Sequence, residues 1–205
     1  MTRRPAFFFL FLSLLPGLYA QSPSLLEVQQ ALAATRFELA ESKLDVLYSE
    51  EADKDGLFYS IKGLIAAKRS DFASAENFLK KAVIVGFGGD IAAFNLAELY
   101  YEMGKYPEAL EQYKSIRNQT WLNDLARFKM MLCYLLTDQK KVARQILESF
   151  NVEDQLPVFH CSQAAWAFAN GQVEQGRYYV QAAKDLYVDQ GSQFLPLLRE
   201  QGWIE

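Results

Sequence analysis

The sequence is poor in the residues that most often bind metals or carry catalysis. Its 205 residues include one histidine, His160, and two cysteines, Cys133 and Cys161. These three side chains cannot supply the four ligands of a zinc site unless carboxylates complete the set. No paired carboxylates, phosphate-binding loop or catalytic triad stands out. We therefore expect a protein that is not an enzyme and that holds no metal and no cofactor.

An excess of basic residues is also missing. The chain has 21 Lys and Arg against 25 Asp and Glu, which gives a formal charge of −4 and a pI near 5.2. Proteins that bind nucleic acids need a basic surface to neutralise phosphates, so we expect no nucleic-acid partner. The hydrophobic fraction of 51% is high enough for a packed core and argues against disorder.

Apolar runs of membrane length are absent. Arginines at positions 3 and 4 precede an apolar stretch from Phe7 to Leu15, which ends shortly before Ala20. This arrangement is typical of a secretory signal peptide, residues 1–20, cleaved near Ala20. The alternative is an uncleaved anchor, but the stretch is much shorter than the roughly 20 residues that span a bilayer. We expect an exported protein, periplasmic or secreted, with no transmembrane segment in the mature chain.

Internal similarity fills most of the remaining sequence. The segment from Asp71 to Leu79 returns 34 residues later, from Lys105 to Tyr113. Continuing this step in both directions aligns a series of small residues with spacings of 35, 34, 34 and 33: Ala40, Ala75, Ala109, Ala143 and Gly176. Turn signals such as Met103-Gly104-Lys105 fall shortly before these residues, where two helices of one unit would be joined.

A unit of about 34 residues made of two helices resembles the tetratricopeptide repeat. The third copy matches the family pattern best, with eight residues in register: Leu96, Ala97, Tyr100, Gly104, Tyr106, Ala109, Tyr113 and Ile116. The resemblance covers residues 21–190 in about five copies, 21–55, 56–89, 90–123, 124–156 and 157–190. It implies an all-α fold, a right-handed superhelical solenoid of antiparallel helix pairs.

The physical properties of such units agree with the pattern. Two short helices, each with one apolar stripe, cannot bury those stripes alone, so neighbouring units stack and share a core. A small residue is needed where the two helices cross, because a larger side chain would hold the backbones beyond the usual separation of about 8–10 Å. The last segment, residues 191–205, is apolar enough to form a capping helix or to occupy the groove of the solenoid; capping is the expected role.

In this family the first helix of each pair lines the concave face, which commonly holds an extended peptide or a partner helix. We call the corresponding positions the first-helix face, and the resemblance places these partner-binding candidates on it: Phe94, Tyr101, Leu125, Phe128, Leu132, Leu135 and Phe168. A large apolar surface normally marks a contact site. The alternative is ordinary core, because a register error of one residue turns lining into core.

Members of the family that bind chaperones grip a carboxylate with a clamp of Lys, Arg and Asn. Only Asn95 and Lys129 lie near such positions, which disfavours that function. The leading hypothesis is an exported, non-enzymatic scaffold in the cell envelope that binds a protein or peptide in an apolar concave groove. The alternative is a structural or self-associating repeat protein, including a homo-oligomer, whose groove is filled by its own tail or by a second copy.

The histidine and the cysteines have simpler interpretations. His160 opens the fifth copy at a position usually filled by a packing aromatic, and catalysis would require a nucleophile and an acid beside it. Export to an oxidising compartment would allow a disulfide between Cys133 and Cys161, although a disulfide requires a narrow range of Cα separations. A disulfide and two free thiols are therefore both left open.

Overall fold

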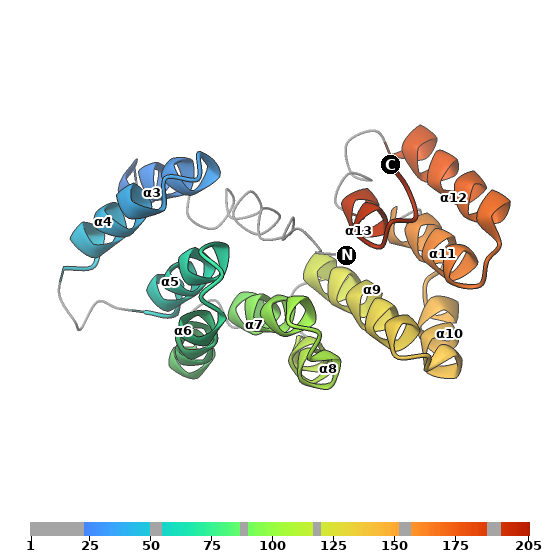
Figure 1. Cartoon of the computed structure of the whole chain (residues 1–205), viewed down its shortest axis with the longest axis horizontal. Coiled ribbons are helices and arrows are strands. Elements are labelled where there is room, and N and C mark those ends of the chain that lie inside the picture. The colour runs from blue at the N-terminus through green and yellow to red at the C-terminus, as the bar shows by residue number, and fades with distance from the viewer. Residues whose placement is uncertain (1–22, 50–54, 87–89, 117–119, 152–156, 188–193) are drawn as a thin grey trace. The chain divides into compact units, whose positions relative to one another are not determined.

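The computed structural model of the chain describes residues 23–49, 55–86, 90–116, 120–151, 157–187 and 194–205. These residues form eleven helices, α3 to α13, and contain no strand, which confirms the all-α prediction (Figure 1). The predicted signal peptide, residues 1–20, lies outside the described residues. The structure divides into two compact units, Met1–Ser115 and Ile116–Glu205.

The first unit contains three pairs of consecutive helices. The pairs are α3 (Pro23–Ala33) with α4 (Phe37–Leu47), α5 (Gly56–Lys68) with α6 (Phe72–Val85), and α7 (Asp90–Glu102) with α8 (Tyr106–Ser115). Neighbouring pairs contact each other through α4 and α5, through α5 and α7, and through α6 and α7. Each pair therefore packs on the next pair along the chain.

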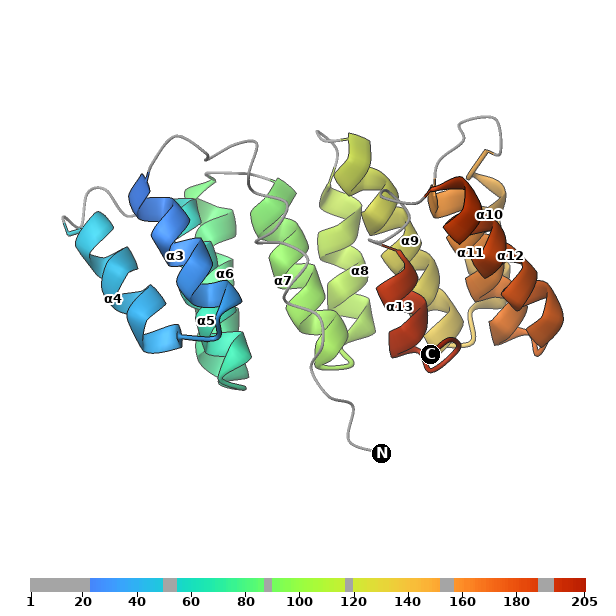
Figure 2. The same cartoon turned by 90° about the horizontal axis from the view of Figure 1, so that it is seen from above.

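The second unit contains two further pairs and a short last helix. They are α9 (Thr120–Leu136) with α10 (Lys140–Glu148), α11 (Pro157–Ala169) with α12 (Val173–Leu186), and α13 (Leu195–Glu200) (Figure 2). Both α9 and α10 contact α11, and α13 also packs against α11. Helix α9 begins ahead of residue 124, where the repeat pattern places the start of the fourth copy.

The turn inside every pair has the same backbone geometry. One residue in each turn has a positive φ, between 56° and 75°: Thr35, Ser70, Gly104, Asp138 and Gly171. The N–H of the following residue donates to a carbonyl oxygen five residues earlier at 2.8–2.9 Å, as from Lys105 to Tyr100. This is the Schellman arrangement, which satisfies the last carbonyl groups of the first helix and reverses the chain. The turns recur at spacings of 35, 34, 34 and 33 residues, like the small residues.

The small residues identified in the sequence lie where the second helix of each pair packs. Four of them are completely buried: Ala40, Ala75, Ala109 and Ala143. Gly176 of α12 is so close to α11 that a Cβ atom on it would lie 2.6 Å from Cε1 of Phe168. A methyl group is therefore tolerated at four of these crossings, whereas the fifth requires glycine because an aromatic ring occupies the space.

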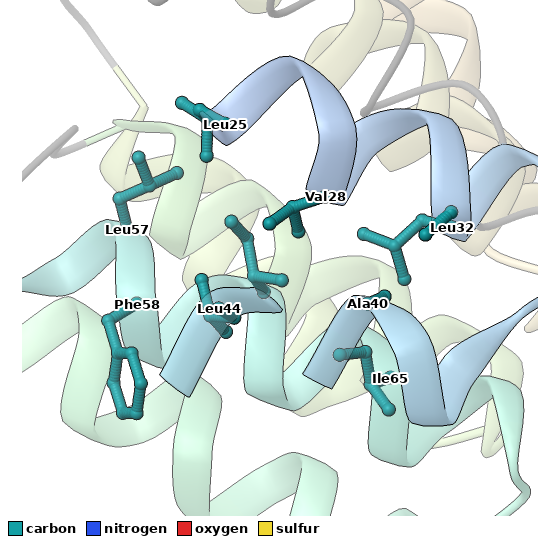
Figure 3. Packing of buried hydrophobic residues seen from close by; sticks show 10 residues of the cluster. Leu25, Val28, Leu32, Ala40, Leu44, Leu57, Phe58 and Ile65 are labelled. Atoms are coloured by element: carbon teal, nitrogen blue, oxygen red, sulfur yellow. The ribbon is translucent and has the colours of Figure 1, made fainter. Parts of the chain in front are cut away.

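The first pair is attached to the second pair by a shared apolar core. Leu25 and Val28 of α3 and Leu44 of α4 belong to one buried cluster with residues of α5, including Leu57 and Phe58 (Figure 3). Val28 and Leu44 are completely buried. The stripes of three helices from two pairs thus form one core, as the stacking argument predicts for helices that cannot bury their stripes alone.

Ion pairs border this core on the side where α4 faces α5. The Lys62 ammonium group lies 3.0 Å from Glu41 and 2.8 Å from Asp45. The Arg69 guanidinium group lies 2.9 Å from Glu41 and 3.2 Å from Glu38. The hydrogen bond from Lys62 lowers the pKa of Glu41; burial opposes this, and Arg69 reinforces it. Three acids on α4 therefore face two bases on α5 and its C-terminal turn.

Candidate partner-binding face

The first-helix face is largely buried in the structure. Five of its seven candidates are buried, namely Phe94, Tyr101, Leu125, Phe128 and Leu132, whereas Leu135 and Phe168 are half-buried. Phe94 and Tyr101 lie on α7 in the first unit. The other five lie on α9 and α11, which contact each other in the second unit. The structure therefore brings together the candidates of α9 and α11 within one unit.

The two candidates of the first unit pack against the second helix of their own pair. The Phe94 ring lies 5.4 Å from that of Tyr113 on α8, with the planes inclined at 64°. The Tyr101 ring lies 5.6 Å from that of Tyr106, also edge to face. Such aromatic pairs stabilise a contact beyond the area that they bury. Part of the role of Phe94 and Tyr101 is therefore to hold α7 and α8 together.

Buried polar residues accompany the aromatic residues of α7. Glu98 is 8% exposed, and its carboxylate accepts a hydrogen bond from the Tyr113 hydroxyl group. Asn95 is 3% exposed, so one of the two residues near the clamp positions is enclosed in the first unit. The other, Lys129, is 1% exposed on α9 in the second unit. An exposed clamp for a carboxylate is not formed by these two residues.

Two candidates of the second unit, Phe128 and Phe168, contact the end of the chain. Phe194, immediately before α13, has its ring 5.6 Å from that of Phe128, with the planes 82° apart. Trp203, beyond α13, stacks on Phe168 at 6.1 Å with an interplanar angle of 19°. Leu198 of α13 is completely buried. The tail therefore lies on the first-helix face of α9 and α11 and covers two of the residues proposed to bind a partner.

Sequence reasoning identified the tail as a plug or cap without identifying its contacts. The feature of the sequence that indicates a plug or cap is a largely apolar segment with Phe194 near its start and Trp203 near its end. Their partners, Phe128 and Phe168, lie on different helices far away in the sequence. Only the packing of α9 against α11 places these two rings where one short segment reaches both of them.

Cys133 and Cys161 are not joined by a disulfide in the structure. Cys133 and Cys161 are completely buried on α9 and α11. Burial raises the pKa of the Cys161 thiol to about 12. Because the thiolate is the reactive form, this side chain is inert near neutral pH. Of the two alternatives drawn from the sequence, the structure has the one without a disulfide.

His160 lies in a cluster of aromatic rings. Its ring is 5.1 Å from that of Phe159 and 5.7 Å from that of Tyr187, which directly follows α12. The Tyr187 hydroxyl group is 3.4 Å from Nδ1 of His160. Burial lowers the pKa of His160, which favours the neutral imidazole at pH 7. These contacts fit the packing role that the sequence predicts for this position.

The described ranges contain no group of three or more His, Cys, Asp or Glu side chains that could hold a metal ion. Within the same ranges, each helix is too short or too polar to cross a bilayer.

Comparison with known proteins adds no relative. The sequence matches no protein-family model, and a search of curated proteins finds no similar sequence.

Proposed function

We propose that the chain is a non-enzymatic scaffold of tetratricopeptide-like repeats, exported to the cell envelope, that binds a peptide or a partner helix on its first-helix face. In this proposal the five helix pairs are antiparallel and stack as a right-handed superhelical solenoid. The recurring turns, spaced by 35, 34, 34 and 33 residues, support the repeat. The buried small residues at the helix crossings support the packing of the two helices within each pair.

One observation carries the binding role. The face formed by α9 and α11 holds an apolar helical segment, α13, through contacts of Phe128 and Phe168 with its flanking aromatic residues. A surface that holds one short helix has the shape and the apolar chemistry to hold another. Aromatic side chains in such a contact contribute a large share of the binding free energy.

The same contact favours a second candidate function. Because the bound segment belongs to the same chain, the face of α9 and α11 is already filled, as in a structural or self-associating repeat protein. A second copy that donated its tail would make equivalent contacts and produce a homo-oligomer. The two candidates differ in what occupies this face in the cell.

Site-specific photo-cross-linking in the native cells distinguishes these functions. Leu135 is half-buried on α9, so a benzoylphenylalanine residue there is reachable from the first-helix face. The matched control replaces Gln145, which is exposed on α10 of the same pair. We expect position 135 to form a cross-link to a different protein and position 145 to form none. Mass spectrometry of the cross-linked chain also tests export, because a chain cleaved after Ala20 begins at Gln21.

The other outcomes are equally informative. A cross-link between two copies assigns the face to self-association, and cross-links confined to residues 194–205 of the same chain assign it to the tail. Either result, in a chain that keeps its helical circular dichroism, contradicts partner binding at α9. Equal cross-linking from positions 135 and 145 contradicts a specific face.

A further inference from the structure

The tail makes an ordered set of contacts with the second unit. Phe194 contacts Phe128 on α9, and Trp203 contacts Phe168 on α11. Between these two contacts, Leu197 and Leu198 are 1% and 0% exposed. These four apolar residues define the pattern of the tail. Leu197 and Leu198 lie three and four positions after Phe194, and Trp203 lies five positions after Leu198.

Hydrogen bonds within the tail pair part of its backbone. The N–H of Leu197 donates to the carbonyl oxygen of Phe194 at 3.1 Å, and that of Trp203 donates to the carbonyl oxygen of Leu198 at 3.2 Å. Gly202, with φ of 72°, ends α13 and turns the chain so that Trp203 points back to the unit. Both of these hydrogen bonds join groups within the tail, so neither of them ties the tail to α9 or α11.

The helix itself depends on the surface that it covers. It spans six residues and has Pro196 at its start. An isolated helix of that length is not stable in water, because the first turn fixes several dihedral angles for few hydrogen bonds. The tail therefore gains its helical form by packing on α9 and α11, which is also how a disordered peptide folds when it binds a partner.

We propose that the tail is an intramolecular ligand that occupies the partner site of the second unit, and that the partner is a short amphipathic helix with the same pattern of side chains. This inference rests on the proposed function and specifies the partner. The scaffold side of the contact offers two phenyl rings, those of Phe128 and Phe168. Such a surface selects aromatic residues and leucines and disfavours a charged side chain in place of any of them, because a charge there would lose its hydration without a partner.

A competition experiment with the full chain tests this inference. The probe is a fluorescein-labelled synthetic peptide of residues 194–205, and the variant is Phe194→Ser with Trp203→Ser. We expect the peptide to bind the variant at least tenfold more tightly than the unmodified chain, because the variant tail no longer competes. The matched control is Arg199→Ser, an exposed change in the same helix that should bind like the unmodified chain. A peptide with both serines should not bind.

Three outcomes overturn the inference. One is equal binding of the peptide by the variant and the unmodified chain, and another is loss of helical circular dichroism in the variant, which would make the tail a necessary part of the fold. The third is a concentration-dependent dimer of the unmodified chain that the variant cannot form, which would assign the face to a second copy.

Hydrogen exchange on the unmodified chain provides a test that requires no mutation. We expect the amides of Leu198, Gly202 and Trp203 to exchange at least tenfold faster than the slowest amides of α11 and α12, through local release of the tail. We also expect excess unlabelled peptide to increase their exchange further, because it captures the open face. Tail amides that exchange only as slowly as those of α11 and α12 would overturn the inference.

The inference and the proposed function fail in different ways. A partner that is cross-linked at position 135 and is not displaced by the tail peptide leaves the function and removes the intramolecular ligand. Tight binding of the peptide by the variant, with no partner cross-linked in cells, supports the tail site and removes the function.

Discussion

At the scale of single residues, the five turns share a left-handed backbone position, but the residues that occupy it tolerate a positive φ to different degrees. Thr35 is exposed and has φ of 56°, although its β-branched side chain disfavours positive φ. Gly104 occupies the equivalent position two pairs later with φ of 73°. A Cβ atom on Gly104 would meet no atom within 4 Å, so its backbone conformation alone explains the glycine.

We expect Thr35→Gly to stabilise the first unit and Gly104→Ala to destabilise it. A side chain in the left-handed region costs about 1–2 kcal/mol relative to glycine. Glycine is freer in the unfolded chain and loses more freedom on folding, so the net difference in stability is smaller than this cost. The expected changes in the free energy of unfolding are a gain of about 0.5–1 kcal/mol for Thr35→Gly and a loss of about 1 kcal/mol for Gly104→Ala. Urea denaturation followed by circular dichroism measures both.

The two substitutions are controls for each other, because they make opposite changes at the same point of the repeat. Shifts of the same sign would contradict the assignment of a common turn geometry. Thr35→Ala keeps a Cβ atom in the left-handed region and should recover little of the stability gained with glycine.

At the scale of elements, the charges between α4 and α5 give the first interface a dependence on pH. Glu41 accepts hydrogen bonds from both Lys62 and Arg69, and Lys62 is its strongest partner in lowering its pKa. A carboxyl group whose pKa is lower in the folded state stabilises the fold once it is ionised. Its contribution is complete above the ordinary value of 4.5 and is lost as the pH falls through the lowered folded value.

We expect Glu41→Gln to cost about 0.5–1 kcal/mol of unfolding free energy at neutral pH, the usual scale of a partly exposed ion pair. The difference from the unmodified chain should shrink as the pH is lowered from about 6 to about 3, because the unmodified carboxylate becomes protonated there. The urea midpoint at several pH values measures this. Glu111→Gln, at an exposed position of α8, is the control. A constant difference across that pH range would contradict the role of the charge.

At the scale of the whole molecule, the division into two compact units has a consequence for unfolding. Repeat structures are held together by contacts between neighbours, so a local defect need not unfold distant parts. Ala109 is completely buried in the last pair of the first unit. It is a suitable place for a defect that belongs to one unit.

We expect Ala109→Arg to unfold α7 and α8 while α11 and α12 keep their protection from hydrogen exchange. The larger side chain overpacks the crossing and brings a charge into it, at a combined cost of about 3 kcal/mol or more. Peptide-resolved hydrogen exchange by mass spectrometry reports on each unit separately. Ser115→Arg introduces the same charge at an exposed residue of α8 and should leave the exchange unchanged. Simultaneous loss of protection in both units would show that they unfold as one body.

The sequence predicted the repeated features of the fold well. The small residues at Ala40, Ala75, Ala109 and Ala143 were located by spacing alone, and each is buried at its crossing. Local chemistry explains this success, because a helix pair needs a small contact residue and a chain reversal at fixed distances from each other. The ion pairs of Lys62 and Arg69 with α4 were not predicted, because charged residues on helices are common and few of them meet.

The sequence by itself determined the helices, their period and the apolar character of the first-helix face. These properties depend on residues within one repeat of about 34 residues, so they can be predicted from local sequence patterns. The tertiary structure alone decided that Phe94 and Tyr101 pack against α8, and that Phe128 and Phe168 receive the tail. Apolar side chains at helical spacing carry no information about which surface covers them. The surface that covers a side chain is decided by segments that are distant in the sequence and meet only when the helices of one compact unit pack together.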